Sequence, residues 1–222
     1  EEEDGAWKLC KEADIRKIVG ENNTSLKIAT MADVGRTIKE EIPPKSESVV
    51  DMIRVATYIH QLPEAIELIE DFHAKGYETT CNIMAISKSF DDELDQVLQT
   101  LAQTNVDVIY IADSFGSFYP EQINKLTAKY LGAAKPVGKK VGIHAHNNLT
   151  LAYANTLEAM IYGTSYLDVT VSGLGRGAGN CAMELLLGFL KNPKYKLLPV
   201  LKFIEEHIVP LEKELDWALV YP

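Results

Sequence analysis

Two histidines separated by a single residue, His144 and His146, form the segment of this sequence whose chemistry is easiest to interpret. They lie in residues 139–146, which we interpret as a short buried β-strand that ends in polar residues, and Asn147 and Asn148 follow them directly. In a β-strand, residues i and i+2 point to the same face and lie roughly 6.5–7 Å apart along the chain. Neutral imidazole is the commonest protein ligand of metal ions, so these two side chains can converge on one ion. The alternative is that both histidines only form local hydrogen bonds at a strand end.

A glycine-rich segment, Ser-Gly-Leu-Gly-Arg-Gly-Ala-Gly-Asn over residues 172–180, is the second place where chemistry is indicated. Glycine lets the backbone adopt positive φ angles and approach a ligand closely. The segment does not predict a dinucleotide site, because it follows the last predicted strand and no acidic ribose partner lies about 20 residues further on. It also lacks the Gly-Lys-Ser/Thr of a phosphate-binding loop. We interpret it as a turn that brings Asn180 beside the histidines, with its side-chain oxygen as a third metal ligand.

The elements that must position these residues alternate along the chain. Runs rich in β-branched residues predict strands over residues 26–32, 52–57, 78–86, 106–112, 140–146 and 166–171. Amphipathic stretches predict helices over residues 62–74, 92–103, 120–131, 151–161 and 182–190. Several strands are almost entirely apolar, as expected for parallel strands covered on both faces. The β-α alternation predicts a parallel α/β sheet or barrel.

Six strand-plus-helix units fall two short of the eight that close a (β/α)₈ TIM barrel. A helical pattern at residues 14–19 precedes the first predicted strand, and residue 1 is Glu and not Met. We therefore expect a TIM barrel whose first two units are missing from this sequence. Residues 1–197 would form the partial barrel, and residues 198–222 a C-terminal extension that is helical over 198–217. Because an incomplete barrel exposes two sheet edges, we expect the missing units to exist in the native protein and residues 1–222 alone to aggregate or fold poorly.

The composition limits the classes of function. The 222 residues are 46% hydrophobic and 24% charged, which is ordinary for a globular domain. The formal net charge of -10 argues against nucleic acid or an anionic membrane as the main partner. No apolar run approaches the roughly 20 residues that cross a bilayer. Three widely separated cysteines predict free thiols in a reducing compartment, so we expect a cytoplasmic protein.

Active sites of α/β barrels lie at the C-terminal ends of the strands. Besides the two segments described first, the predicted strand ends carry Asp33, Arg54 with Thr57, Asn82 with Met84, and Asp113 with Ser114. Lys88 is the lysine nearest to a strand end, but no lysine is placed as a Schiff-base enzyme requires. We expect the active site at this rim.

Residues 142–156 and 167–180 together resemble the DRE-TIM metallolyases. This superfamily contains the hydroxymethylglutaryl-CoA lyases, the isopropylmalate and homocitrate synthases and the 4-hydroxy-2-oxovalerate aldolases. The aldolases are the branch that the sequence resembles most, and residues 54–57 and 112–114 also match their strand ends. The resemblance covers roughly residues 26–190.

The resemblance implies a divalent metal site. His144 and His146 correspond to its two histidine ligands, and Asn180 corresponds to an asparagine that ligates or approaches the metal. Imidazole and oxygen ligands together suit Mn²⁺, Mg²⁺, Co²⁺ or Zn²⁺, of which we expect Mn²⁺. The family motif Asp-x-Thr-x-Arg-Asp-Gly, which supplies an aspartate ligand and an enolate-stabilising arginine, is absent. The histidine base that follows it in the aldolases is absent too, so with nothing before residue 1 we expect weak metal binding and impaired catalysis.

The resemblance also implies residues that act on the substrate. Ser114 corresponds to a serine that contacts the carboxylate of the pyruvate moiety, and Arg54 to an arginine that helps to shape the rim. We predict catalytic roles for Arg54 and Ser114, and substrate-binding roles for these two residues and Asn82.

These assignments predict a class II aldolase-like lyase. It would cleave a 4-hydroxy-2-oxo acid to pyruvate and an aldehyde through a metal-stabilised enolate. Two alternatives stay open, a Claisen-type synthase that condenses an acyl-CoA with a 2-oxo acid, and a non-catalytic barrel domain. We expect a small 2-oxo acid as the binding partner, allow a homodimer, and expect no stable dehydrogenase partner because the C-terminal extension is short.

Overall fold

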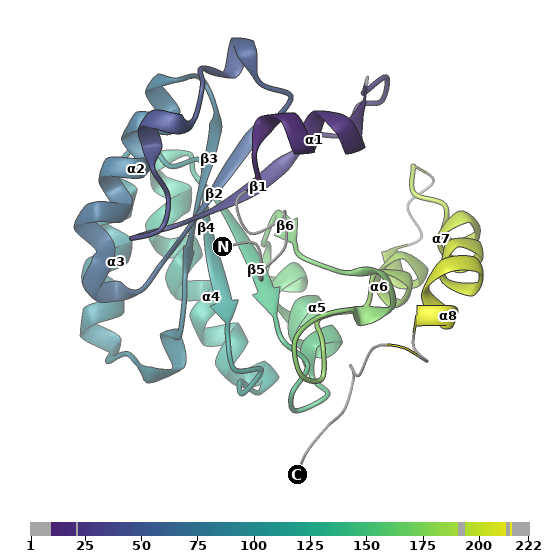
Figure 1. Ribbon diagram of the computed structural model, residues 1–222. Coiled ribbons are helices and arrows are strands. Elements are labelled where there is room, and N and C mark those ends of the chain that lie inside the picture. The colour runs from purple at the N-terminus through teal and green to yellow at the C-terminus, as the bar shows by residue number, and fades with distance from the viewer. Residues whose placement is uncertain (1–9, 21, 191–193, 212–213, 215–222) are drawn as a thin grey trace.

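The computed structural model describes residues 10–20, 22–190, 194–211 and 214, which form one curved parallel sheet with helices on its convex face (Figure 1). The six strands are β1 (Ala29–Asp33), β2 (Met52–Thr57), β3 (Glu78–Ile83), β4 (Val108–Asp113), β5 (Lys140–Ala145) and β6 (Tyr166–Leu167). They are neighbours in the order of the sequence, and every neighbouring pair is parallel. The predicted α/β architecture, with parallel strands arranged as in part of a TIM barrel, is confirmed.

The helices follow the strands in the expected order. They are α1 (Glu12–Val19), α2 (Leu62–Ala74), α3 (Asp91–Ala102), α4 (Pro120–Ala134), α5 (Ala152–Tyr162), α6 (Met183–Leu190), α7 (Leu197–Phe203) and α8 (Val209–Leu211). Helix α2 shows why these segments are helical: Pro63 occupies the first turn, where its missing amide hydrogen costs no hydrogen bond. Leu68, Ile69 and Phe72 recur at helical spacing and are buried against the sheet, and Gly76 ends the turn with φ +92°.

The two faces of the sheet differ in chemistry. Alternate strand residues such as Val55, Cys81 and Ile143 belong to the buried core between sheet and helices. The residues between them point to the concave face, since strand side chains alternate, and this face carries polar and aromatic groups. Two contacts cross the concave face: Tyr166 Oη on β6 donates to Glu78 on β3 at 2.9 Å, and Arg54 on β2 pairs with Asp168 directly after β6. A sheet that brings such distant strands together is strongly curved, as in a barrel.

The connection between β1 and β2 does not complete one of the six strand-plus-helix units that were counted, although no helix was predicted at residues 33–51. It contains no α-helix, only two single turns of 3₁₀ helix at Lys39–Glu41 and Lys45–Glu47. Pro43 and Pro44 lie between these turns, and proline cannot continue a helix because it lacks the amide hydrogen and clashes with the preceding turn. The count of six strand-plus-helix units is therefore wrong. Five strands are followed by an α-helix.

Strand β6 is also shorter than the predicted 166–171. The amide of Asp168 still donates to Ile143 O on β5 at 2.9 Å, but the amide of Thr170 donates to Cys181 O at 3.0 Å. The chain therefore leaves the sheet and pairs with the return of its own glycine-rich loop, and Val171–Gly173 forms a 3₁₀ turn. Strand β1 begins at Ala29, three residues later than predicted.

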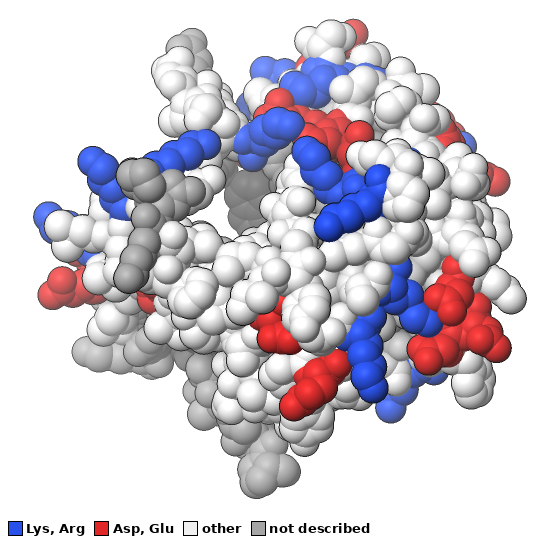
Figure 2. Space-filling view, turned by 180° about the vertical axis from the view of Figure 1, so that it is seen from behind, with Lys and Arg blue, Asp and Glu red and all other residues white. Residues whose placement is uncertain are grey.

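The described part of the C-terminal extension lies on the β6 side of the sheet, beside α6 and far from α2 and α3 (Figure 1). Helix α7 continues through a π-helical turn at Ile204–Ile208 into α8, so the predicted helix over 198–217 is confirmed as far as Leu211. Its remainder, apart from Glu214, and residues 1–9 lie outside the described residues. No described helix is long and apolar enough to cross a membrane. On the face seen in Figure 2, basic side chains lie interspersed with acidic ones.

Gly142 on β5 provides a test of the packing on the concave face. A Cβ at this position would lie 2.5 Å from the ring of Tyr110 on the neighbouring strand, so Gly142→Ala must displace that ring. We expect a loss of about 1–3 kcal/mol in the free energy of unfolding, measured by urea denaturation. Gly132→Ala in α4 is the matched control, because its Cβ would meet nothing within 4 Å. The packing argument fails if the two variants have the same stability.

The ion pair between Lys27 and Glu78 predicts a pH dependence of stability. Burial alone would raise the pKa of Glu78, but the interactions with Lys27 and Tyr166 outweigh it and hold that pKa below its ordinary value. A carboxylate with a lowered pKa stabilises the fold above its unfolded pKa of about 4.3, and this contribution is lost as the pH falls through the folded pKa.

We therefore expect wild type to be more stable than Glu78→Gln by a constant amount above about pH 5, and this difference to shrink below about pH 4. Urea unfolding at a series of pH values measures it. Glu67→Gln, on the exposed face of α2, should show no such trend. A difference between wild type and Glu78→Gln that does not change with pH would contradict the argument.

Candidate active site

His144 and His146 point to the same face at the end of β5, as predicted from strand alternation. Their ring centroids are 5.0 Å apart, with the planes at 80°. Burial, together with the nearby His144 and Arg176, lowers the pKa of His146. His146 is therefore neutral near pH 7, the form in which imidazole can ligate a metal.

Asp168 joins His144 to Arg54. Its Oδ2 lies 3.0 Å from Nδ1 of His144 and also accepts a hydrogen bond from Nη2 of Arg54. Burial would raise the pKa of Asp168, but the contacts with His144 and Arg54 outweigh it and keep that pKa below its ordinary value. The carboxylate is therefore charged, and the guanidinium of Arg54 balances its charge.

Arg54 is supported from the other side by an aromatic ring. Its Cζ lies 4.5 Å from the ring centroid of Tyr110, a cation–π geometry. Tyr110 is buried, and burial raises the pKa of its hydroxyl, so the ring stays uncharged. The absence of a side chain at Gly142 leaves the space that this ring occupies.

The glycine-rich loop brings Asn180 to His146. Gly173, Gly177 and Gly179 all have positive φ angles, which side chains rarely allow, and these turns fold the loop back so that Asn180 pairs with His146 in an antiparallel bridge. A Cβ at Gly175 would lie 2.4 Å from Asn180 Nδ2. Asn180 Nδ2 donates to Leu174 O at 3.2 Å, whereas its Oδ1 is buried without a hydrogen-bond partner.

The two asparagines after the histidines hold the surrounding loops. Asn147 Oδ1 accepts from the amide of Ala152 at the start of α5, at 3.2 Å. Asn148 donates through Nδ2 to Phe115 O at 2.9 Å and accepts through Oδ1 from the amide of Ala178 at 3.3 Å. Asn148 therefore connects the loop after β4 with the glycine-rich loop.

A pocket of about 270 Å³ opens beside these residues. It is lined by Arg54, His144, Leu167, Asp168, Val169, Thr170 and Asn180. Three residues that were predicted from distant segments, Arg54, His144 and Asn180, thus meet at one place.

The donor atoms at this place fit a divalent cation. Asp168 engages Nδ1 of His144 and leaves Nε2 available, His146 is neutral, and the buried Oδ1 of Asn180 lacks a partner. The donor set is limited to two imidazoles and one amide oxygen. Among the described residues, no group of three or more His, Cys, Asp or Glu side chains could hold a metal.

Ser114 and Asn82 lie elsewhere on the rim. Ser114 Oγ accepts from the amide of Ala85 at 2.9 Å and so fixes the loop after β3, where Ala85 has φ +55°. Asn82 is 5% exposed, and its Oδ1 accepts from Thr80 Oγ1 at 3.0 Å. Neither residue lines the pocket described above, and their contacts with substrate stay predictions.

Asp168 is the site residue that the sequence analysis missed. It was included in the predicted strand over 166–171 and given no role. A signal was present, since it is the one ionisable carboxylate in an otherwise apolar or weakly polar run, and buried carboxylates are rare unless they are paired.

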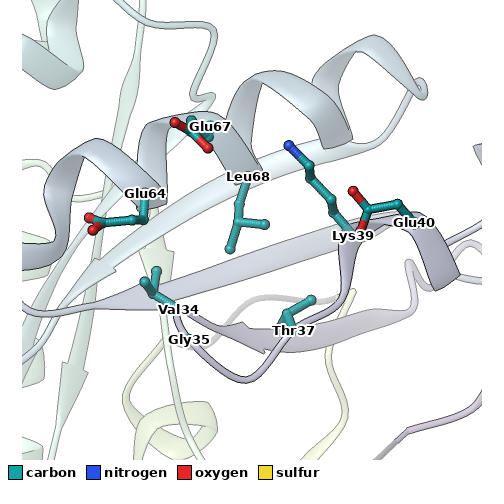
Figure 3. Close-up of a pocket in the computed structure, with 8 residues that line it drawn as sticks. All are labelled: Val34, Gly35, Thr37, Lys39, Glu40, Glu64, Glu67 and Leu68. Carbon is teal, nitrogen blue, oxygen red and sulfur yellow. The ribbon is translucent and has the colours of Figure 1, made fainter.

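A second hollow, of about 220 Å³, lies between the β1–β2 connection and α2 (Figure 3). Its lining consists of Val34, Gly35, Thr37, Lys39, Glu40, Glu64, Glu67 and Leu68. The two glutamates of α2 and the charged residues of the connection surround it, and its lining contains no His or Cys. We assign no chemistry to it.

The chain is similar to known proteins in sequence and in structure. The profile of the HMGL-like family matches residues 8–204. The oxaloacetate decarboxylase of Mycobacterium tuberculosis is 32% identical over 142 residues, which are 64% of this chain and 41% of that protein. The 4-hydroxy-2-oxovalerate aldolase of Carboxydothermus hydrogenoformans is 31% identical over 207 residues, which are 90% of this chain and 60% of that protein.

A solved structure is similar over most of the chain. The N-terminal domain of an aldolase candidate from Bacteroides vulgatus has 28% sequence identity and a TM-score of 0.75, covering 92% of this chain and 69% of that one. The chain spans between 41% and 60% of the length of the two curated relatives named above.

Proposed function

The chain belongs to the HMGL-like family, which confirms the resemblance found in the sequence, and we propose that it forms part of a divalent-metal-dependent lyase acting on 2-oxo acids. The substrate we propose is a 4-hydroxy-2-oxo acid such as 4-hydroxy-2-oxovalerate, cleaved to pyruvate and an aldehyde. One observation carries this proposal: His144, His146 and the unpartnered amide oxygen of Asn180 meet at the C-terminal ends of the strands. The aldolase relative supports the choice of substrate.

The metal, for which we propose Mn²⁺, would be held by ring nitrogens of His144 and His146 and by Oδ1 of Asn180. When bound, such an ion acts as a Lewis acid that stabilises the enolate left by C–C cleavage. The protein supplies the rest: Asp168 orients His144, and the loop backbone orients Asn180. Arg54, which is paired with Asp168, forms part of the wall of the pocket that an incoming 2-oxo acid would enter.

Cleavage of a 4-hydroxy-2-oxo acid also needs a base, because the 4-hydroxyl must lose its proton as the C3–C4 bond breaks. None of the described residues that line the pocket is free for this role. His144 is assigned to the metal, and Asp168 is already paired with Arg54 and His144. The remaining described histidines lie elsewhere, for example His60, which stacks on Tyr58.

A second candidate function is decarboxylation of a 2-oxo dicarboxylate such as oxaloacetate, a reaction that needs no such base. The bond between C3 and its carboxylate breaks, CO₂ leaves with no proton removed, and the electron pair remains as the enolate of pyruvate. Protonation of C3 by solvent then gives pyruvate. The oxaloacetate decarboxylase relative supports this candidate.

The deciding experiment assays the protein with Mn²⁺ and each substrate, and detects pyruvate with a coupled lactate dehydrogenase. Pyruvate from 4-hydroxy-2-oxovalerate that a chelator abolishes supports the aldolase. Chelator-sensitive pyruvate from oxaloacetate alone, above the rate with His144→Ala, supports the decarboxylase. Turnover of neither substrate, with thiol release from acetyl-CoA and a 2-oxo acid, would indicate the Claisen-type synthase. Metal binding without any turnover would indicate a non-catalytic barrel domain.

We expect His144→Ala and His146→Ala each to remove most of the bound metal, because each takes away one of three protein ligands. Elemental analysis of the purified protein measures the metal content. His60→Ala is the control, since His60 stacks on Tyr58 outside the site. Binding should also weaken at acid pH, because protonated imidazole cannot ligate. Unchanged metal content in both site variants would refute the assignment.

A further inference from the structure

Asp168 is the residue on which the charged side chains of the pocket converge, and its side chain is only 16% exposed. One oxygen, Oδ2, receives both Nη2 of Arg54 and Nδ1 of His144. A largely buried carboxylate that meets two partners through one oxygen has little freedom to rotate.

The backbone on both sides of Asp168 is fixed as well. Its own amide donates to Ile143 O on β5, and two residues later the amide of Thr170 donates to Cys181 O, directly after the glycine-rich loop. The carboxylate is therefore anchored between the strand that carries His144 and the loop that carries Asn180.

The side chain of Arg54 is held in place by an aromatic ring on the neighbouring part of the sheet. The ring of Tyr110 lies under its guanidinium at 4.5 Å, and Gly142 leaves room for that ring. Because Arg54 balances the charge of Asp168, His144 has only to donate one hydrogen bond to the carboxylate.

We propose that Asp168 is a positioning residue that fixes His144 as the Nδ1–H tautomer, with Nε2 free toward the pocket. An ionised carboxylate can only accept hydrogen bonds, so the ring nitrogen facing it must carry the proton. The other nitrogen is then the one with a lone pair, which is what a metal ligand requires. The effect of this tautomer on metal binding rests on the proposed metal-dependent function. The tautomer itself does not, because it can be observed without metal or substrate.

The first test is a long-range ¹H–¹⁵N correlation spectrum of the histidine side chains in the metal-free wild-type protein. We expect His144 to appear with its proton on Nδ1, and His144→Ala identifies the signal by its loss. A proton on Nε2 of His144 would overturn the proposal. This measurement needs no Asp168 variant and so does not depend on how such a variant folds.

The second test uses Asp168→Asn, whose amide can present either an oxygen or an NH₂ group to the ring and so no longer selects one tautomer. We expect mixed tautomers of His144 and a Kd for Mn²⁺, measured by calorimetry, about 10–100-fold weaker. Asp107→Asn is the matched control. Asp107 directly precedes β4, at the opposite end of the sheet from the site, and its carboxylate accepts a hydrogen bond from the amide of Thr79.

The outcomes separate this inference from the proposed function. An Asp168→Asn variant that keeps the wild-type tautomer and the wild-type Kd would overturn the positioning role. Wild-type protein that binds no Mn²⁺ would refute the proposed function, while the spectrum still decides the role of Asp168.

Discussion

The ion pair between Arg54 and Asp168 is the interaction on which the arrangement of the pocket depends. It joins β2 to the segment after β6 across the concave face, so it forms only if the intervening strands curve. Two largely buried charges are costly unless each is paired, which means that loss of either partner leaves an uncompensated charge in the interior. The cation–π contact of Arg54 with Tyr110 and the hydrogen bond from His144 are further partners of the pair, whereas Nε of Arg54 is buried without a hydrogen-bond partner. Curvature of the sheet and orientation of the histidine are therefore linked through one carboxylate.

The glycine-rich loop places Asn180 at the same site, and its conformation costs stability. Its glycines lose more backbone entropy on folding than other residues would, and they contribute no side-chain packing. Their positive φ angles allow the backbone to close tightly around the amide of Asn180. One oxygen of that amide is left buried without a partner, an arrangement that normally destabilises a protein. A bound cation would satisfy this oxygen. Unpaired polar groups of this kind are expected where a fold gives up stability for binding.

Local patterns predicted part of this site and could not predict the rest. Strand alternation placed His144 and His146 on one face, and Asn180 was expected beside them because loops that follow parallel strands meet at the same edge of the sheet. The partners of Asp168 could not be derived, because Arg54 lies 114 residues away and their contact depends on how strongly the sheet curves. The error in counting six strand-plus-helix units could have been avoided, because Pro43 and Pro44 break any helical pattern in the connection between β1 and β2.

Apolar and polar residues are distributed differently over the two faces of the six-stranded sheet. The buried hydrophobic cluster lies between the sheet and its helices, and strand residues such as Ile109 and Val141 contribute to it only from the convex side. The concave face instead carries Glu78, which accepts a hydrogen bond from Tyr166, and Arg54, which pairs with Asp168. The apolar core between the sheet and its helices is therefore covered, whereas the outer edges of β1 and β6 have no partner strand among the described residues. The edges, rather than the core, are where such a sheet requires a neighbour.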